Sequence, residues 1–405
     1  MTGPLENIRV IDFTRVLAGP FCTQLLGDLG ADIIKIERPN IGDDTRKWGP
    51  PYLEDAQGNE TNESAYYLSA NRNKRSITID LARPEGQALA KRLIAKGDIV
   101  VENFKVGTLK KYGLAYDQIK ASAPALVYCS ITGFGQTGPY APRAGYDYLA
   151  QAMGGLMSIT GEPTSAPVKV GIGIADIMAG MYAANAILAA LHRRDVTGEG
   201  QYIDIGLLDS QVAWLTYEGQ NYLSGGKVPK RLGNAHPNIV PYQTFEAADG
   251  YFVLAVGNDR QFHKFCNVAG CPQLASDPRF TTNTQRIANR KELAALLSDI
   301  LIQKPIKYWT EALEKQGVPS GPVNNIREVF EDPQIRHRDM KIQMPSPTQD
   351  GKQIDMIGNP IKLSQTPVSY RHSPPVLGQH TDEVLGELLE MSALELKDLR
   401  EKDII

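Results

Sequence analysis

The first 130 residues alternate short β-branched runs with amphipathic segments, and this order limits the fold more than any other feature. Strand signals lie at residues 8–13, 32–36, 76–80, 98–102 and 125–131, with helix signals between them at 21–29, 84–96 and 108–112. Strand–helix–strand order is typical of a parallel sheet with helices on its faces. We therefore predict an α/β chain with a Rossmann-like large domain built on a parallel sheet.

The sequence changes character after a helix pattern at 207–222. A polar stretch rich in glycine and proline follows, and an Asp-Gly turn at 249–250 joins two β runs. Residues 340–380 are extended and rich in proline. We expect a discontinuous large domain (1–207 together with 345–405), a smaller α+β domain (228–330), and linkers at 208–227 and 331–344.

The composition argues against several classes of protein. The chain has 43 basic and 46 acidic residues, whereas a nucleic-acid or membrane-surface binder needs a concentrated basic field. Four cysteines without a C-x-x-C pair disfavour a disulfide framework or a zinc ribbon, and Cys22 and Cys129 lie in apolar contexts typical of buried thiols. With no secretory-type N-terminus and no apolar run of 18 residues, we expect a cytoplasmic protein without a metal, a nucleic acid or a membrane.

A glycine-rich segment, 170–176, precedes a long apolar helix pattern at 176–193. Gly171 and Gly173 resemble the start of a dinucleotide fingerprint, but Asp176 replaces the third glycine and would repel a pyrophosphate. Two interpretations of Asp176 remain open. Asp is a preferred N-cap residue, and a carboxylate that a helix N-terminus keeps ionised can also serve as a covalent nucleophile. For Asp147, near the start of another helix pattern, capping is the better interpretation.

Several stretches, taken in order, resemble the class III CoA-transferases, the group of formyl-CoA transferase and the carnitine and bile-acid CoA-transferases. The matching segments are Leu5–Thr14, Ala18–Pro20, Gly30–Arg38, Gly42–Asp43, Thr45–Arg46, Trp48, Asn73–Ser76, Val101–Phe104, Thr197–Gln201 and Leu377–Val384. The resemblance implies an interlocked homodimer that acts on acyl-CoA and a carboxylic acid, with CoA as substrate and no permanently bound cofactor.

The resemblance also implies roles for individual residues. The family's nucleophile begins a long helix after a glycine-rich strand end, which is Asp176 here, and forms mixed anhydrides and an aspartyl-CoA thioester. The implied CoA contacts are Arg38, Ile79, Asn103, Phe104, Lys111, Arg143 and Tyr146. The implied positions near the acyl groups are Arg15, Leu17, Arg46, Trp48, Gly233 and Asn234. Gly233–Asn234 and Gly257–Asn258 are the candidate loops for stabilising an oxyanion.

Finer matches, such as Thr14–Phe21 and Tyr128–Pro139, are similar to the dicarboxylate-using subgroup of succinyl-CoA:glutarate CoA-transferase. The resemblance therefore implies succinyl-CoA or another dicarboxylyl-CoA as donor. A desolvated remote carboxylate needs a cation, and arginine suits it, so Arg15, Arg46 and Arg143 are candidates.

Other functions stay open beside CoA transfer. The family also contains α-methylacyl-CoA racemases, which use a histidine where this chain has Tyr146, and the phenol's unperturbed pKa of about 10 makes it a poor base at neutral pH. A racemase, another enzyme acting on a CoA ester, and a CoA-binding protein without turnover remain the alternatives.

Overall fold

The computed structural model describes residues 3–405, which divide into two compact units. Unit 1 contains the described residues up to Leu156 together with Lys169–Ser224 and Pro333–Ile405. Unit 2 contains Met157–Val168 and Gly225–Asp332. Both units are therefore built from segments that are separated along the chain.

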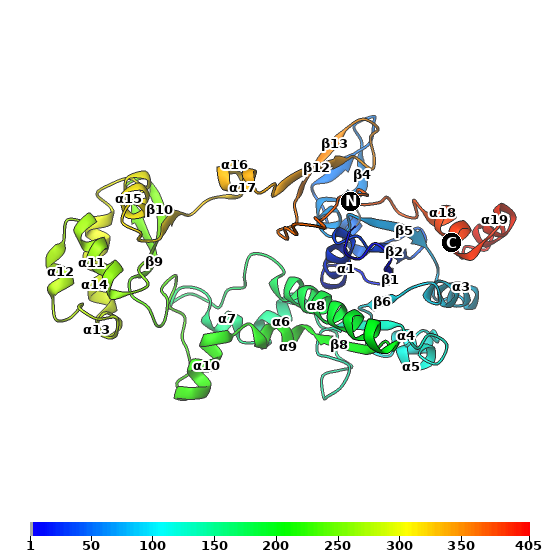
Figure 1. The fold of residues 1–405 in the computed structure, drawn as a ribbon, viewed down its shortest axis with the longest axis horizontal. Helices are drawn as coiled ribbons and strands as arrows, with labels where there is room; N and C mark the ends of the chain where they lie inside the picture. The colour runs from blue at the N-terminus through cyan, green and yellow to red at the C-terminus, as the bar shows by residue number, and fades with distance from the viewer. Residues whose placement is uncertain (1–2) are drawn as a thin grey trace. The chain divides into compact units, whose positions relative to one another are not determined.

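A six-stranded parallel sheet forms the centre of unit 1 (Figure 1). Its strand order is β5-β2-β1-β6-β7-β8, and every neighbouring pair is parallel. The strands are β1 (Arg9–Asp12), β2 (Asp32–Glu37), β5 (Lys74–Thr78), β6 (Ile99–Glu102), β7 (Val127–Thr132) and β8 (Tyr202–Gly206). The predicted α/β fold with a parallel sheet is confirmed.

Successive strand residues point to opposite faces of this sheet, so each face has its own core. Val10 and Ile33 pack under α1 (Ala18–Asp28) and α8 (Ile174–Thr197). Ile11 and Ile34 pack on the other face with α3 (Pro84–Ile94) and α18 (Thr381–Leu389). The C-terminal helices α18 and α19 (Ala393–Glu401) thus lie in the same unit as the sheet that the first 206 residues form, and they contribute to the core on this face.

Helix α8 is the longest element and the only helix within residues 3–405 that is long and apolar enough to cross a membrane. Its most apolar window has a mean hydropathy of 1.6, and 56% of that window is buried inside the protein. Small residues let it approach α1 closely, since a Cβ on Gly180 would lie 2.6 Å from the carbonyl oxygen of Ala18. These contacts are those of a core helix.

Unit 2 contains an antiparallel sheet of β9 (Tyr242–Ala247), β10 (Gly250–Ala255) and β11 (Ser320–Pro322). The Asp-Gly turn joins β9 to β10, so the predicted hairpin is confirmed. The helices of this unit are α7 (Leu156–Ile159), α11 (Asp259–Val268), α12 (Pro272–Ser276), α13 (Asn283–Ala288), α14 (Arg290–Leu301), α15 (Ile306–Glu314) and α16 (Ile326–Glu331).

The structure differs from the predicted domain boundaries at both linkers. Residues 208–227 hold most of α9 (Leu207–Ala213) and α10 (Thr216–Gly225). Residues 331–344 include α17 (Pro333–His337) and the start of β12 (Lys341–Pro345). The helix pattern at 207–222 is thus confirmed by α9 and α10, and the glycine- and proline-rich sequence that suggested a linker begins only at Ser224.

Three further segments were not anticipated. Residues 157–168 join unit 2 because Gly233 donates its amide to the Gly161 carbonyl, at 3.0 Å. The extended C-terminal region contains a hairpin of β12 and β13 (Gln353–Ile357). Between β2 and β5 the chain forms a 3-10 turn (Asp44–Lys47), β3 (Tyr52–Glu54), β4 (Glu60–Ser64) and α2 (Ala65–Ser69).

Candidate active site

Asp176 is the third residue of α8, and its side chain does not cap that helix. The N-cap position is Gly173, which has no side chain to offer. The capping carboxylate is Asp147 of α6 (Asp147–Met153), which accepts the amides of Ala175 at 2.8 Å and of Asp176 at 3.4 Å. No hydrogen bond or ion pair from residues 3–405 engages the Asp176 carboxylate. Of the two interpretations from the sequence, N-capping by Asp176 is wrong.

Asp176 is 9% exposed, and this burial sets its charge state. Burial, and after it the negative charge of Asp147, raises the pKa of Asp176 to about 7. Burial therefore opposes the ionisation that the helix N-terminus was expected to favour. A helix terminus contributes roughly 0.3–1 kcal/mol, which is less than the cost of desolvating a carboxylate.

A pocket of about 560 Å³ opens beside Asp176 at the carboxyl edge of the sheet. It is lined by residues 15–18 after β1, 103–106 after β6, 131–133 at the end of β7, and 143–146 before α6. Strand order reverses between β1 and β6, because β2 and β5 lie on one side and β7 and β8 on the other. Such a switch point is where open parallel sheets bind ligands. We call this hollow the switch-point pocket.

Four of the predicted CoA contacts lie together in the switch-point pocket: Asn103, Phe104, Arg143 and Tyr146. The Asn103 amide holds the loop after β1, accepting the Arg15 amide at 3.0 Å and donating to the Arg15 carbonyl at 2.6 Å. The Arg143 guanidinium lies over two aromatic rings, 5.1 Å from the Phe134 centroid and 4.6 Å from that of Tyr140. The structure thus joins these residues, far apart in sequence, into one site with Asp176.

Three predicted CoA contacts lie outside this pocket. Arg38 is exposed at the end of β2, in a separate hollow of about 330 Å³. Lys111 is exposed at the end of α4 (Thr108–Lys111). Ile79 is 1% exposed in the core beside α3, so the prediction that its side chain lies under a nucleotide is wrong for this structure.

Arg46 cannot pair with a substrate carboxylate, which corrects the sequence-based prediction. Its guanidinium is 2% exposed and lies 2.6 Å from a carboxylate oxygen of Glu37 and 2.6 Å from one of Glu63. It also stacks 3.8 Å from the ring centroid of Tyr67. The Arg46 guanidinium is already paired with both glutamates and stacked on the tyrosine ring, so its role is structural.

The other predicted acyl-site residues of unit 1 do surround Asp176. Arg15 lines the switch-point pocket in an exposed ion pair with Asp44, at 3.0 Å. Leu17 and Trp48 line both that pocket and an adjoining one of about 810 Å³, which we call the acyl-side pocket. Asp176 also lines both pockets. Sequence reasoning missed several polar residues of the acyl-side pocket, Tyr66 and Lys169 among them, because neither of these two belongs to a motif.

The predicted oxyanion loops belong to unit 2, and two of their amides are already used. The Gly233 amide donates to Gly161, as described above. The Gly257 amide donates to the Gln261 side chain at 2.8 Å. Asn234 follows Gly233 in the same exposed turn. The glycine amides of the two candidate loops are therefore engaged, and the role of Gly233–Asn234 or Gly257–Asn258 in stabilising an oxyanion stays a prediction.

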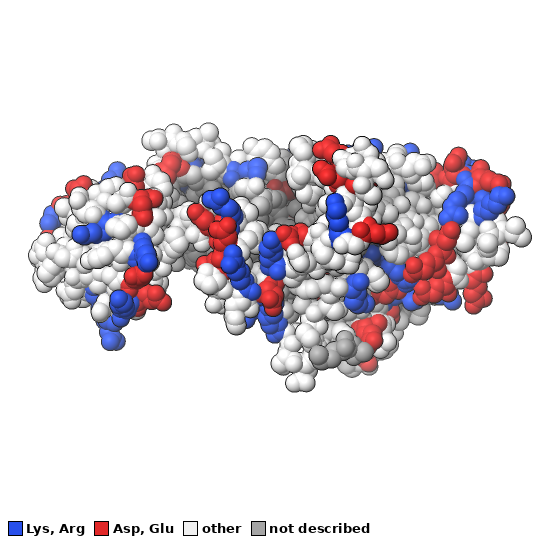
Figure 2. All heavy atoms as spheres, turned by 90° about the horizontal axis from the view of Figure 1, so that it is seen from above, with Lys and Arg blue, Asp and Glu red and all other residues white. Residues whose placement is uncertain are grey.

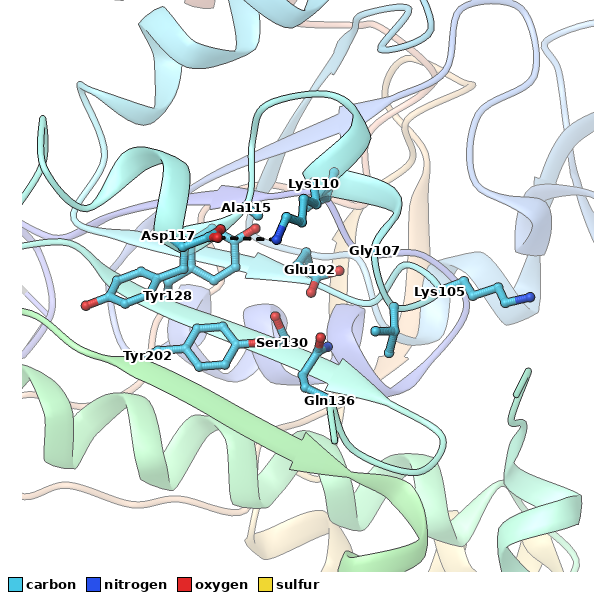
Figure 3. Close-up of a pocket in the computed structure, with 13 residues that line it drawn as sticks. Glu102, Lys105, Gly107, Lys110, Ala115, Asp117, Tyr128, Ser130, Gln136 and Tyr202 are labelled. Atoms are coloured by element: carbon cyan, nitrogen blue, oxygen red, sulfur yellow. Dashed lines mark ion pairs between the residues drawn. The ribbon is translucent and has the colours of Figure 1, made fainter. Parts of the chain in front are cut away.

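A third pocket, of about 330 Å³, adjoins the switch-point pocket along Lys105 and Val106 (Figure 3). Glu102 is 6% exposed, and burial raises its pKa to about 7. Tyr116 and Tyr202 stack at 5.4 Å on one side. Figure 3 also shows the ion pair of Lys110 with Asp117, drawn above the ring of Tyr202.

The surface charges and the potential metal ligands of the protein are dispersed. Basic and acidic side chains are interspersed on the face drawn in Figure 2, without a large field of one sign. Within residues 3–405, no three His, Cys, Asp or Glu side chains come together as a metal-ligand set. The four cysteines are buried as free thiols, so the prediction for Cys22 and Cys129 is confirmed.

Comparisons with known proteins agree with the site. The model of CoA-transferase family III matches residues 5–381. The chain is 50% identical to succinate–glutarate CoA-transferase of Agrobacterium fabrum, over 95% of this chain and 96% of that protein. It is 46% identical to human succinyl-CoA:glutarate CoA-transferase, over 95% of this chain and 86% of that protein. A crystal structure of a CaiB/BaiF family protein from Brucella suis superposes with a TM-score of 0.85 at 48% identity, covering 96% of this chain and 100% of that one. The chain is therefore an enzyme and belongs to CoA-transferase family III.

Proposed function

We propose that this enzyme moves CoA from succinyl-CoA, or another dicarboxylyl-CoA, to a carboxylic acid, with Asp176 as covalent nucleophile. One observation carries the proposal: Asp176 is a buried carboxylate without a protein partner, and it lines two adjoining pockets. The switch-point pocket holds four of the seven predicted CoA contacts, and the acyl-side pocket leaves room for an acyl group. The names of the similar Agrobacterium and human proteins support a dicarboxylyl donor.

The reaction needs no general base once Asp176 is ionised. An Asp176 oxygen attacks the thioester carbonyl, the C–S bond breaks, and CoA thiolate leaves a mixed anhydride. The thiolate then attacks the Asp176 carbonyl, which releases the donor acid and forms an aspartyl-CoA thioester. The acceptor carboxylate displaces the thiolate to give a second anhydride, and thiolate attack on its acyl carbon frees the new acyl-CoA and Asp176.

The remote carboxylate of a dicarboxylyl group needs a cation within reach of Asp176. Arg46 is excluded by its buried ion pairs, which leaves Arg15 and Arg143 of the original candidates. A substrate carboxylate can replace Asp44 on Arg15, because an exposed ion pair contributes only about 0–1 kcal/mol. We therefore favour Arg15, whereas Arg143 is held over two rings. Arg15→Gln should lower kcat/KM for glutarate but not for a monocarboxylate of similar length. An unchanged kcat/KM for glutarate would favour Arg143 instead.

A racemase is the second candidate. Tyr146 stands where the racemases have histidine, and it is 66% exposed in the pocket of Asp176. A phenol in water is a weak base at neutral pH. Exchange of deuterium into the α-carbon of an acyl-CoA, without any acceptor acid, would favour racemisation over transfer.

We further propose that the enzyme works as a homodimer in the cytoplasm. Large apolar side chains are exposed on α8 and on the stretch that forms α9 and α10: Met181, Tyr182, Val212, Trp214, Tyr217, Tyr222 and Leu223. Contiguous exposed apolar surface is typical of an interface between proteins. Light scattering coupled to size-exclusion chromatography should give twice the monomer mass, and a monomer would contradict this.

The decisive experiment is to trap the covalent enzyme. Incubation with succinyl-CoA followed by hydroxylamine should convert Asp176 to a hydroxamate that peptide mass spectrometry locates. Asp176→Asn should lose both the adduct and CoA transfer while keeping its circular dichroism spectrum. Transfer by that variant at the wild-type rate would refute the proposed mechanism.

A further inference from the structure

Two side chains of α6, one helical turn apart, hold the segment that carries the nucleophile. Asp147 accepts the first amides of α8 through Oδ1, as described above. Gln151 is fully buried, and its Nε2 donates to Asp147 Oδ2 at 2.7 Å. The same amide group accepts the Val170 amide at 2.9 Å through Oε1. The pair therefore fixes both the glycine-rich segment and the first turn of α8.

The same contacts place a second negative charge beside the nucleophile. Four carboxylates lie on the elements packed against α8: Asp28 on α1, Asp147 on α6, Asp204 on β8 and Asp209 on α9. Among these, only Asp147 bonds the first turn of α8. Asp28 is paired with Arg72 at 2.5 Å, and Asp204 accepts the Gln136 amide at 3.0 Å.

The remaining ionisable groups around Asp176 lie in its two pockets and do not contact its carboxylate. In the described residues these are Arg15, Asp44, Lys105, Arg143 and Tyr146 in the switch-point pocket, and Tyr66, Arg72, Tyr148 and Lys169 in the acyl-side pocket. Arg15 and Arg72 are already paired with acids, and the Lys169 ammonium donates to the Val170 carbonyl at 3.0 Å. Asp147 is therefore the charge most closely joined to the nucleophile.

We propose that Asp147 is a positioning residue with two effects on Asp176: it fixes the first turn of α8, and its negative charge destabilises the ionised nucleophile relative to its neutral covalent forms. The inference rests on the proposed function. Two carboxylates in one buried site repel each other, so one of them holds its proton more tightly. An anhydride or a thioester at Asp176 carries no charge, and its formation relieves that repulsion. Asp147 thus favours the covalent enzyme.

The charge role predicts a shift in pH dependence that a purely structural role would not produce. The rate of enzyme-bound thioester formation, measured in a single turnover with succinyl-CoA, should fall below about pH 7 in the wild type, because burial and Asp147 raise the pKa of Asp176 to about 7. Asp147→Asn keeps an oxygen that can accept the Ala175 amide but removes the charge. In this variant the acid limb, the fall in the rate of thioester formation toward low pH, should move to a lower pH by about one unit or more.

A matched control removes one negative charge from the far end of α8, the helix that carries Asp176. Asp195 lies near the C-terminal end of α8 with its side chain 71% exposed, so Asp195→Asn should leave the acid limb unchanged. Asp147→Ser, a smaller neutral variant, answers the question if Asp147→Asn does not fold.

The outcomes separate this inference from the proposed function. If thioester still forms in Asp176→Asn, the proposed function fails. Suppose instead that Asp176→Asn abolishes thioester formation, but the neutral Asp147 variants lose rate at the same acidic pH as the wild type. Then only the charge role of Asp147 fails, whatever rate those variants reach at high pH. A shifted acid limb in the Asp147 variants and an unshifted one in Asp195→Asn would establish the inference.

Discussion

Replacing Asp176 by asparagine should stabilise the folded enzyme while abolishing its activity. The folded protein raises the pKa of this carboxyl from 3.8 to about 7, so the folded state binds the proton more tightly than the unfolded state does. Stability from this group is present in full below pH 4 and is lost as the pH rises to 7. Asparagine keeps the shape of the side chain but does not ionise. The variant's gain in free energy of unfolding over the wild type should therefore grow as the pH rises over that range.

The size of the effect follows from the shift. At about 1.36 kcal/mol per pKa unit, the shift from 3.8 to about 7 sets an upper limit of roughly 4 kcal/mol at pH 8. At pH 5 the same linkage gives less than about 2 kcal/mol, because Asp176 is then mostly protonated in the folded state. We therefore expect Asp176→Asn to gain up to about 2–3 kcal/mol more at pH 8 than at pH 5.

Urea unfolding at pH 5 and pH 8 measures this difference, because only the change between wild type and variant is compared. Tryptophans report on both units: Trp48 and Trp214 lie in unit 1 with Asp176, and Trp309 lies in unit 2. The unit 1 transition should move to higher urea in the variant. The reasoning about burial would be refuted if the two proteins differed by the same amount at both pH values.

Three further substitutions test other parts of the structure. Arg46→Met should destabilise unit 1 by about 3–5 kcal/mol in urea unfolding, because it leaves two glutamates without their buried cation, and a loss below 1 kcal/mol would contradict that assignment. Asn103→Ala should raise KM for succinyl-CoA by about tenfold, since two hydrogen bonds to the Arg15 backbone are lost; an unchanged KM in steady-state kinetics would remove Asn103 from the CoA site. Glu102→Gln should raise the urea midpoint at pH 8 but much less at pH 5, because burial raises the pKa of Glu102 to about 7; equal midpoints at pH 8 would contradict this burial effect.

The elements of the fold could be predicted wherever a local rule decides the structure. Hydrophobic runs of β-branched residues identified the parallel strands, and the Asp-Gly turn identified the β9–β10 hairpin. Gly30 ends α1 with a φ of +110°, a backbone conformation that glycine adopts without steric cost. The prediction failed at 157–168, because that short polar segment joins unit 2 through contacts with residues far along the chain.

Sequence motifs predicted the family and the position of its nucleophile, but they did not predict which side chains of the site are buried and which are paired. Arg46 and Arg15 are both arginines in matching motifs, yet the fold buries one between two glutamates and leaves the other in an open pocket. No spacing rule foretells that difference, since Glu63 reaches Arg46 through a hairpin that was itself not predicted.

The same division explains Asp176. Its place at the start of a long helix is local information, and the sequence by itself determined it. Its protonation, its burial and its capping by Asp147 depend on α6 packing against α8, which only the tertiary structure decides. The physical reason is that a charge responds to every group within a few ångströms and to the loss of water, whereas helix and strand signals depend on neighbours along the chain.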